Sequence, residues 1–196
     1  MIENLFYIPI YVDEIIEKEL IQEELKNIVS KCNFKYNPIY KNSHKISDTS
    51  FFENILQVHN CNYFLNELHN HIGKYLQGIG SPIDLSKEKY KVTSWITLND
   101  RGDYTAQHNH SAADLSGVYY IQVPENSGNL FFKTPNKGLI SSYCYYHLPE
   151  VCIVNAKEGI ICLFPGWLDH GVLSNESIES RISLSFNITF QRKLFL

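Results

Sequence analysis

Three histidines in the second half of the chain have the residue type and spacing of a metal centre. His108 and His110 are separated by one residue in a segment that we expect to be extended, and His170 follows much later. Because residues i and i+2 of a strand lie on the same face, the first two imidazoles can point at one ion. Imidazole suits iron, zinc, copper or nickel, and a mononuclear site with open coordination positions needs only three protein ligands. We therefore predict that these three histidines form one metal site.

A polar surface loop is the alternative setting for His108 and His110, since histidine is common in such loops. The chain contains a second copy of the same tripeptide, His69-Asn70-His71, inside a segment with a helical pattern. Residues i and i+2 diverge around a helix, so we expect the second pair to lie on a solvated helix face and to bind no metal.

The residues around His170 favour the metal interpretation. An apolar run over residues 159–164 leads into the turn Pro165-Gly166, and the imidazole follows shortly after it. A core strand has no need of such a histidine. Arg181 lies farther on, inside an otherwise apolar strand, and arginine is almost never fully buried without a partner. This arginine can hold a carboxylate.

The strand that contains Arg181 has two chemically different faces. The polar face carries Arg181, Ser183, Ser185 and Asn187, whereas the apolar face carries Ile182, Leu184 and Phe186. Such alternation usually marks a sheet with one solvated face. The functional interpretation is a polar barrel lumen, in which Arg181 forms a bidentate pair with a ligand carboxylate and Ser183 adds a hydroxyl donor. Both interpretations stay open at this point.

The first part of the chain is expected to be mainly helical. Apolar residues recur at helical spacing over residues 13–31 and again over residues 62–77, and the Gly- and Pro-containing segment 78–82 ends the second helix. Between them, residues 34–45 have the pattern of strand and loop, and residues 50–56 are expected to form a short helical turn.

After Pro82 the chain becomes rich in β-branched and aromatic runs separated by Gly, Pro and Asn. The expected strands are residues 91–98, 114–123, 128–132, 151–155, 160–165, 172–173 and 181–190. Short strands at this spacing favour a sandwich or a jelly roll over βαβ units. We predict one domain over residues 1–196, with residues 1–82 as a helical support region and residues 83–196 as a jelly-roll core that carries the metal site.

Composition narrows the class of protein. A chain of 196 residues with 44% hydrophobic residues is long enough for a substantial core, and its net charge of −4 does not favour a nucleic-acid partner. The five cysteines form no CxxC pair, which is typical of reduced thiols in a cytoplasmic protein. We expect neither a signal peptide nor a membrane span. Many β-rich barrels pair through edge strands or helices, so a homodimer is one expected assembly.

These motifs together resemble the 2-oxoglutarate- and Fe(II)-dependent dioxygenase superfamily, and in particular its uncharacterised bacterial and phage branch. Order and spacing both agree from about residue 91 to residue 190. The shared features are Trp95, Gly102-Asp103-Tyr104, His108-Asn109-His110, residues 115–120, residues 128–132, residues 164–170 and residues 181–187. The resemblance implies a double-stranded β-helix, a cupin-like jelly roll, that holds one iron.

The resemblance also implies roles for individual residues. His108 matches the first iron ligand of the superfamily and His170 matches the distal ligand. Arg181 and Ser183 match the pair that grips the far carboxylate of 2-oxoglutarate. Tyr120 matches a tyrosine that often supports the same carboxylate.

His110 is the departure, because it stands where the superfamily has a carboxylate ligand. A three-histidine site has no anionic ligand, so its iron stays more positive, which should raise the Fe(III)/Fe(II) potential. Asp114 is the alternative third ligand, although its four-residue offset from His110 makes its geometry less favourable.

The implied activity is the hydroxylation of an unidentified substrate, either a small molecule or a peptide or protein side chain, with Fe(II) and 2-oxoglutarate as cofactors. A cupin-type dioxygenase that uses three histidines without 2-oxoglutarate is a second hypothesis, in which Arg181 binds the substrate. A non-enzymatic jelly-roll binding protein with a weak metal site is the third. His110 is the residue that keeps these alternatives open.

Overall fold

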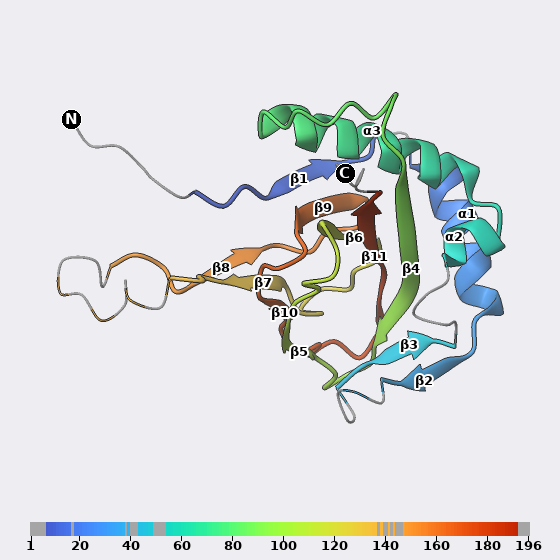
Figure 1. Ribbon diagram of the computed structural model, residues 1–196. Helices are drawn as coiled ribbons and strands as arrows, with labels where there is room; N and C mark the ends of the chain where they lie inside the picture. The colour runs from blue at the N-terminus through green and yellow to red at the C-terminus, as the bar shows by residue number, and fades with distance from the viewer. Residues whose placement is uncertain are drawn as a thin grey trace.

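The computed structural model is a distorted jelly roll in which two antiparallel sheets enclose an interior and helices cover the outside of the larger sheet (Figure 1). The structure describes residues 7–16, 18–37, 39, 43–48, 54–136, 138, 141, 143 and 147–191. The predicted fold class, mainly β with N-terminal helices in a double-stranded β-helix, is confirmed.

The larger sheet has β11 at its centre. Its described strands follow the order β1-β9-β6-β11-β4-β3-β2. Their bounds are β1 Tyr11–Glu14, β2 Phe34–Tyr36, β3 Lys45–Ser47, β4 Tyr90–Asn99, β6 Leu115–Gln122, β9 Ile160–Pro165 and β11 Arg181–Phe190. The N-terminal region therefore supplies β1, β2 and β3 to this sheet in addition to its helices.

The smaller sheet carries the segments that flank the candidate metal site. Its described strands follow the order β5-β10-β7-β8. Their bounds are β5 Thr105–His108, β7 Leu130–Lys133, β8 Val151–Val154 and β10 His170–Val172. Because β5 and β10 are neighbouring strands, His108 lies directly opposite His170, although the two residues are far apart in the sequence.

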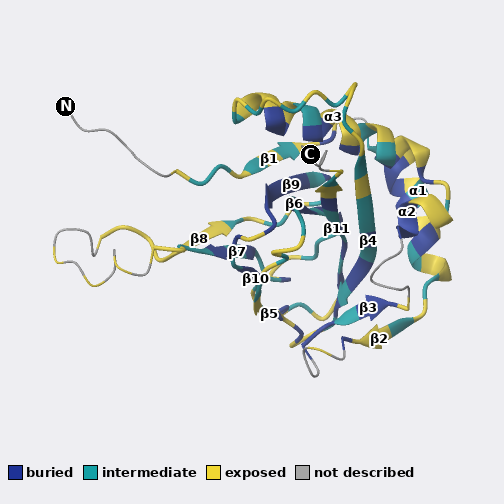
Figure 2. Cartoon of the chain, in the orientation of Figure 1, coloured by how far each residue is buried: buried dark blue, intermediate teal, exposed yellow. Residues whose placement is uncertain are grey.

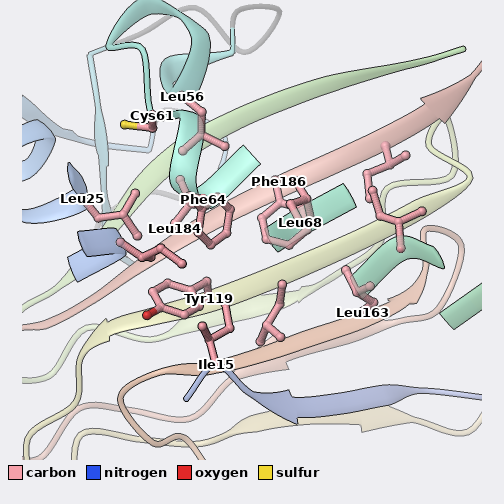
Figure 3. Close-up of a cluster of buried hydrophobic side chains, with 14 of the residues drawn as sticks. Ile15, Leu25, Leu56, Cys61, Phe64, Leu68, Tyr119, Leu163, Leu184 and Phe186 are labelled. Carbon is pink, nitrogen blue, oxygen red and sulfur yellow. The ribbon is translucent and has the colours of Figure 1, made fainter. Parts of the chain in front are cut away.

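The described helices are α1 (Glu19–Lys31), α2 (Ile55–Val58) and α3 (Asn62–Gly78), and they pack on the outer face of the larger sheet (Figures 1 and 2). Phe64 of α3 meets Tyr119 of β6 and Phe186 of β11, with ring centroids 5.2 and 6.1 Å apart (Figure 3). Apolar burial of this kind is the main driving force for folding. Among the described residues, no helix is both long and apolar enough to cross a bilayer.

Strand β11 separates this apolar core from a polar interior. Leu184 and Phe186 have no exposed surface and point toward the helices. Arg181 and Ser183 are also buried, on the face that points toward the smaller sheet. A second apolar cluster packs between the sheets and consists of Leu130, Phe132, Cys162, Phe164 and Leu168.

The first predicted helix begins later than expected. We predicted a helix over residues 13–31, but α1 begins at Glu19 and residues 11–14 form β1. The physical reason is tertiary pairing, since β1 runs antiparallel to β9 from Tyr11 opposite Leu163 to Glu14 opposite Ile160. Intermediate and exposed residues alternate along β1, as in a strand rather than a helix.

Two other boundaries also need correction. The strand expected over residues 172–173 is β10, which begins at His170 itself. The short turn expected over residues 50–56 is α2, which begins at Ile55 after its cap Asn54, while residues 50–53 lie outside the described residues. The prediction of strand and loop over residues 34–45 agrees with β2 and with the start of β3.

A candidate three-histidine metal centre

His108, His110 and His170 meet inside the jelly roll. His108 ends β5 and His170 begins β10, and the two residues are directly paired across these strands. Their ring centroids lie 4.4 Å apart, while the ring of His110 lies 4.9 Å from His108 and 5.3 Å from His170. One ring nitrogen from each residue lies within 4.8 Å of the other two. This separation suits three ligands of a single ion.

Backbone carbonyls orient two of the imidazoles. Nδ1 of His108 lies 2.8 Å from the carbonyl of Ala106, and Nδ1 of His170 lies 2.8 Å from the carbonyl of Leu168. A carbonyl only accepts, so Nδ1 must carry the proton in both residues and Nε2 carries the lone pair. This arrangement is typical of histidine ligands, whose second nitrogen usually donates to a fixed acceptor.

His110 reaches the cluster from a turn rather than from a strand. We expected His108 and His110 to share one strand face, but β5 ends at His108. The N–H of His110 donates to the carbonyl of Gly166 at 2.7 Å, and its carbonyl accepts from Ala113 at 2.8 Å. A Cβ on Gly166 would lie 2.3 Å from the carbonyl oxygen of Ala113, so only glycine allows this approach.

Burial keeps the three imidazoles neutral. It lowers the pKa of His108, lowers that of His110 to about 4 and lowers that of His170 to about 3. A neutral imidazole is the form that binds a metal, since protonation would occupy the lone pair. The chemistry of this donor set therefore fits a divalent transition metal at neutral pH.

Asp114 has a different position from the one required of a ligand. Its carboxylate Oδ2 accepts the N–H of Phe190 at 2.8 Å, and its own N–H donates to the carbonyl of Ile188 at 3.0 Å. Among the described residues it is not part of the ligand cluster, which His110 completes. Asp114 thus lies outside the histidine cluster, and the assignment of His110 as the third ligand stays a prediction.

Arg181 is a deeply buried cation with an unsatisfied donor. It exposes 1% of its surface, and Nη1 donates to the carbonyls of Ser127 and Gly128 at 3.3 and 3.1 Å. Nη2 donates to Oδ1 of Asn99 at 2.7 Å, whereas Nε has no partner among the described residues. No described carboxylate forms an ion pair with this guanidinium. Nε and Nη2 share one edge of the guanidinium, which is a geometry that pairs with carboxylates.

The histidine cluster and Arg181 line one cavity of about 320 Å³. Ser183 and Tyr120 line it as well and are almost fully buried, and burial raises the pKa of Tyr120, which keeps its hydroxyl protonated. The polar face of β11 is thus an interior surface and not a solvated one. A buried arginine in a cavity of this kind is costly unless a ligand compensates its charge.

Three residues near the site were not predicted from the sequence: His44 and Asn37, which line the cavity, and Asn99, which accepts from Arg181. His44 is buried, its Nδ1 lies 2.9 Å from Ser43 Oγ, and its Nε2 lies 3.3 Å from Asn37 Nδ2. Burial is the main cause that lowers its pKa to about 4, and the neighbouring His108 and Arg181 act in the same direction. A single histidine between two short strands has no spacing pattern that could have revealed it.

The second histidine pair is only partly as expected. His69 is exposed on α3, but His71 exposes 2% of its surface and does not lie on a solvated face. Nδ1 of His71 lies 2.8 Å from the hydroxyl of Tyr11, so β1 covers this side of the helix. The divergence of residues i and i+2 is confirmed, whereas the predicted solvation of His71 is wrong.

Comparisons with known proteins agree with this geometry. A family model described as "Putative 2OG-Fe(II) oxygenase" matches residues 93–187, which contain the three histidines and Arg181. No curated protein matches the chain. The predicted resemblance to 2-oxoglutarate- and Fe(II)-dependent oxygenases, and the enzyme class that it implies, are therefore confirmed.

Solved structures share the fold at low sequence identity. A Pseudomonas putida prolyl-4-hydroxylase is 13% identical, with 95% of this chain and 94% of that chain covered and a TM-score of 0.62. The carbocyclase SnoK of nogalamycin biosynthesis is 13% identical, with 92% and 79% covered and a TM-score of 0.64. HygX from Streptomyces hygroscopicus, solved with nickel, 2-oxoglutarate and hygromycin B, is 8% identical, with 93% and 83% covered and a TM-score of 0.60.

Proposed function

We propose that this protein, whose residues 93–187 match the 2OG-Fe(II) oxygenase family, uses Fe(II) and 2-oxoglutarate to hydroxylate a small molecule or a peptide side chain. The observation that carries the proposal is the buried guanidinium of Arg181, which has no carboxylate partner among the described residues and lines the same cavity as the histidine cluster. An anionic co-substrate accounts for both features.

His108, His110 and His170 hold the metal in this proposal. Their ring nitrogens gather within 4.8 Å, and burial keeps them neutral. Three protein ligands leave positions open for a chelating co-substrate and oxygen. Bound Fe(II) would supply the activation of oxygen that drives decarboxylation of 2-oxoglutarate and hydroxylation of a C–H bond.

Arg181 binds the far carboxylate of 2-oxoglutarate through Nε and Nη2. Three protein acceptors around Nη1 and Nη2 hold the guanidinium plane in place, so its remaining edge is fixed before the ligand arrives. Ser183 is paired with Tyr120 across β11 and β6, and the two hydroxyls are proposed to support the same carboxylate. Apolar side chains in the cavity wall, including Val118 and Leu130, exclude water and strengthen this charge pairing.

The two alternatives are less well supported. A three-histidine dioxygenase that does not use 2-oxoglutarate would share the ligand set, but the matching family is that of 2-oxoglutarate-dependent oxygenases. A binding protein with a weak metal site gives no account of a buried arginine with an unsatisfied Nε beside three oriented histidines.

The decisive experiment is an anaerobic titration of the Fe(II)-loaded protein with 2-oxoglutarate. We expect the weak visible metal-to-ligand charge-transfer band of the chelated co-substrate, followed by succinate release when oxygen is admitted. The variant Arg181→Gln should raise the Kd for 2-oxoglutarate at least about 30-fold without changing iron content, since loss of a buried charge partner costs about 2 kcal/mol or more.

Arg101→Gln is the matched control, because Arg101 is exposed and does not line the cavity. It should leave the titration unchanged. Iron binding without the charge-transfer band would reject the proposed use of 2-oxoglutarate and favour the three-histidine alternative. Failure of the wild-type protein to bind iron at all would reject both enzyme hypotheses.

A further inference from the structure

The carboxylate of Asp169 joins the two segments that carry the histidines. Its Oδ2 accepts from Nε2 of Gln107 at 2.9 Å, and its Oδ1 accepts from Nδ2 of Asn109 at 2.7 Å. Gln107 and Asn109 flank His108 in the chain, and Asp169 directly precedes His170. A single side chain therefore ties the segment around His108 to the strand that begins with His170.

The backbone of Asp169 is also anchored. Its carbonyl accepts the N–H of Lys133 at 2.9 Å, which fixes it to the end of β7. Both carboxylate oxygens and the carbonyl are thus engaged by three different residues. Since these bonds hold the side chain in one orientation, the negative charge has a defined position next to the ligand cluster.

The charge itself is relevant because the cluster has no anionic member. The grouped ligands are three imidazoles, so a bound divalent ion would keep its full charge within the ligand shell. Asp169 directly precedes His170, and its carboxylate is bound by both chain neighbours of His108. Its negative charge therefore lies beside two members of the cluster.

We propose that Asp169 is a positioning residue that supplies, from outside the ligand shell, the negative charge that the three-histidine site lacks, while Gln107 and Asn109 hold its carboxylate in place. The proposal rests on the metal site of the proposed function but not on the use of 2-oxoglutarate. Residues outside the ligand shell commonly tune metal affinity by about 10- to 100-fold.

The substitution Asp169→Asn separates charge from shape. An asparagine can accept from one neighbouring amide through Oδ1 and donate to the other through Nδ2 once that amide is turned over, so both hydrogen bonds can persist. The variant Asn109→Ala does the reverse, because it keeps the charge and removes one hydrogen bond. Glu150→Gln is the matched control, since it removes an exposed carboxylate that pairs with Lys133 outside the cluster.

The test measures the Kd of Co(II) by calorimetry, together with the Fe(III)/Fe(II) midpoint potential of the iron-loaded protein, and needs no co-substrate. We expect Asp169→Asn to weaken Co(II) binding about tenfold and to raise the potential, because loss of a negative charge favours the reduced ion. Asn109→Ala should weaken binding less and leave the potential near that of wild type. Glu150→Gln should change neither quantity.

Wild-type affinity and potential in Asp169→Asn would overturn the inference and leave the proposed function intact. Equal losses of affinity in Asp169→Asn and Asn109→Ala with no change in potential would also overturn it, since they indicate a structural tie alone. Absence of Co(II) binding to the folded wild-type protein would reject the metal site itself. A wild-type protein that binds Co(II) but does not bind 2-oxoglutarate would reject only the proposed function.

Discussion

The tripeptide His-Asn-His occurs twice in this chain, at residues 69–71 and 108–110, with different outcomes. In α3 the two histidines diverge, so that His69 is exposed and His71 is buried against Tyr11. After β5 the two histidines converge on His170. The same His-x-His spacing can therefore form a metal site only where the backbone conformation lets both side chains converge and a third histidine lies opposite them.

Of the substitutions that test the difference between the two histidine pairs, His170→Ala should have the largest effect on metal binding. This substitution leaves two of the three gathered ring nitrogens, so we expect the Kd of Co(II) to rise more than about 100-fold, beyond the range typical of residues outside the ligand shell. Calorimetric titration measures the change. His69→Ala is the control on the helical pair and should bind Co(II) like wild type; a loss in both variants would show that the pairs are not functionally distinct.

Two glycines, one near each histidine pair, should respond in opposite ways to substitution by alanine. Gly166→Ala should destabilise the fold by about 1 to 3 kcal/mol and weaken Co(II) binding, because its Cβ would overlap the carbonyls of Ala113 and His110. Gly73 follows His71 in α3, and its nearest contact would be an ordinary 3.7 Å to Leu85, so Gly73→Ala should stabilise by about 0.5 to 1 kcal/mol. Denaturant unfolding gives both values, and effects of the same sign would contradict the contrast.

His71 should matter for stability and not for metal binding. The variant His71→Gln removes the ring that faces the hydroxyl of Tyr11 at 2.8 Å, so we expect a loss of about 1 kcal/mol in the free energy of unfolding. Urea unfolding monitored by fluorescence provides the measurement. Unchanged stability combined with weaker Co(II) binding would reverse the roles assigned to the two pairs.

The smallest expected effect is the contribution of His71 to the pH dependence of the free energy of unfolding. Burial lowers the pKa of His71 below 6.5, against the opposing charges of Asp13 and Glu67. As the pH falls below 6.5, the unfolded state therefore binds the proton first, and the folded state loses at most about 1.4 kcal/mol per pH unit through this residue. Unfolding of the metal-free protein at pH 7.5 and 5.5 should show a smaller decrease in His71→Gln than in wild type. An equal decrease in both proteins would disprove the assignment.

Much of the fold could be predicted from local pattern. The apolar positions of α3 and the alternation in β11 are each visible within one segment, and they placed these elements to within about two residues. The true start of α1 could not be read in this way, because residues 11–14 are a strand only by virtue of pairing with β9. Local periodicity contains no information about such a distant partner.

The same distinction between local pattern and distant contacts applies to the candidate site. The three candidate ligands and Arg181 have residue types and an order that are visible in the sequence, and the structure brings them into one cavity. The burial of His71, the turn that carries His110 and the position of His44 depend on contacts with β1, with Gly166 and with Asn37. These contacts join segments that are far apart or too short to show periodicity.

The two different faces of β11 make an error in strand register energetically unfavourable. A slip of one residue in its pairing with β4 would turn Leu184 toward the cavity and Arg181 toward the apolar helices. The burial of Leu184 and Phe186 strongly disfavours that arrangement. Correct burial of the hydrophobic core therefore also fixes the register that places the Arg181 side chain in the cavity.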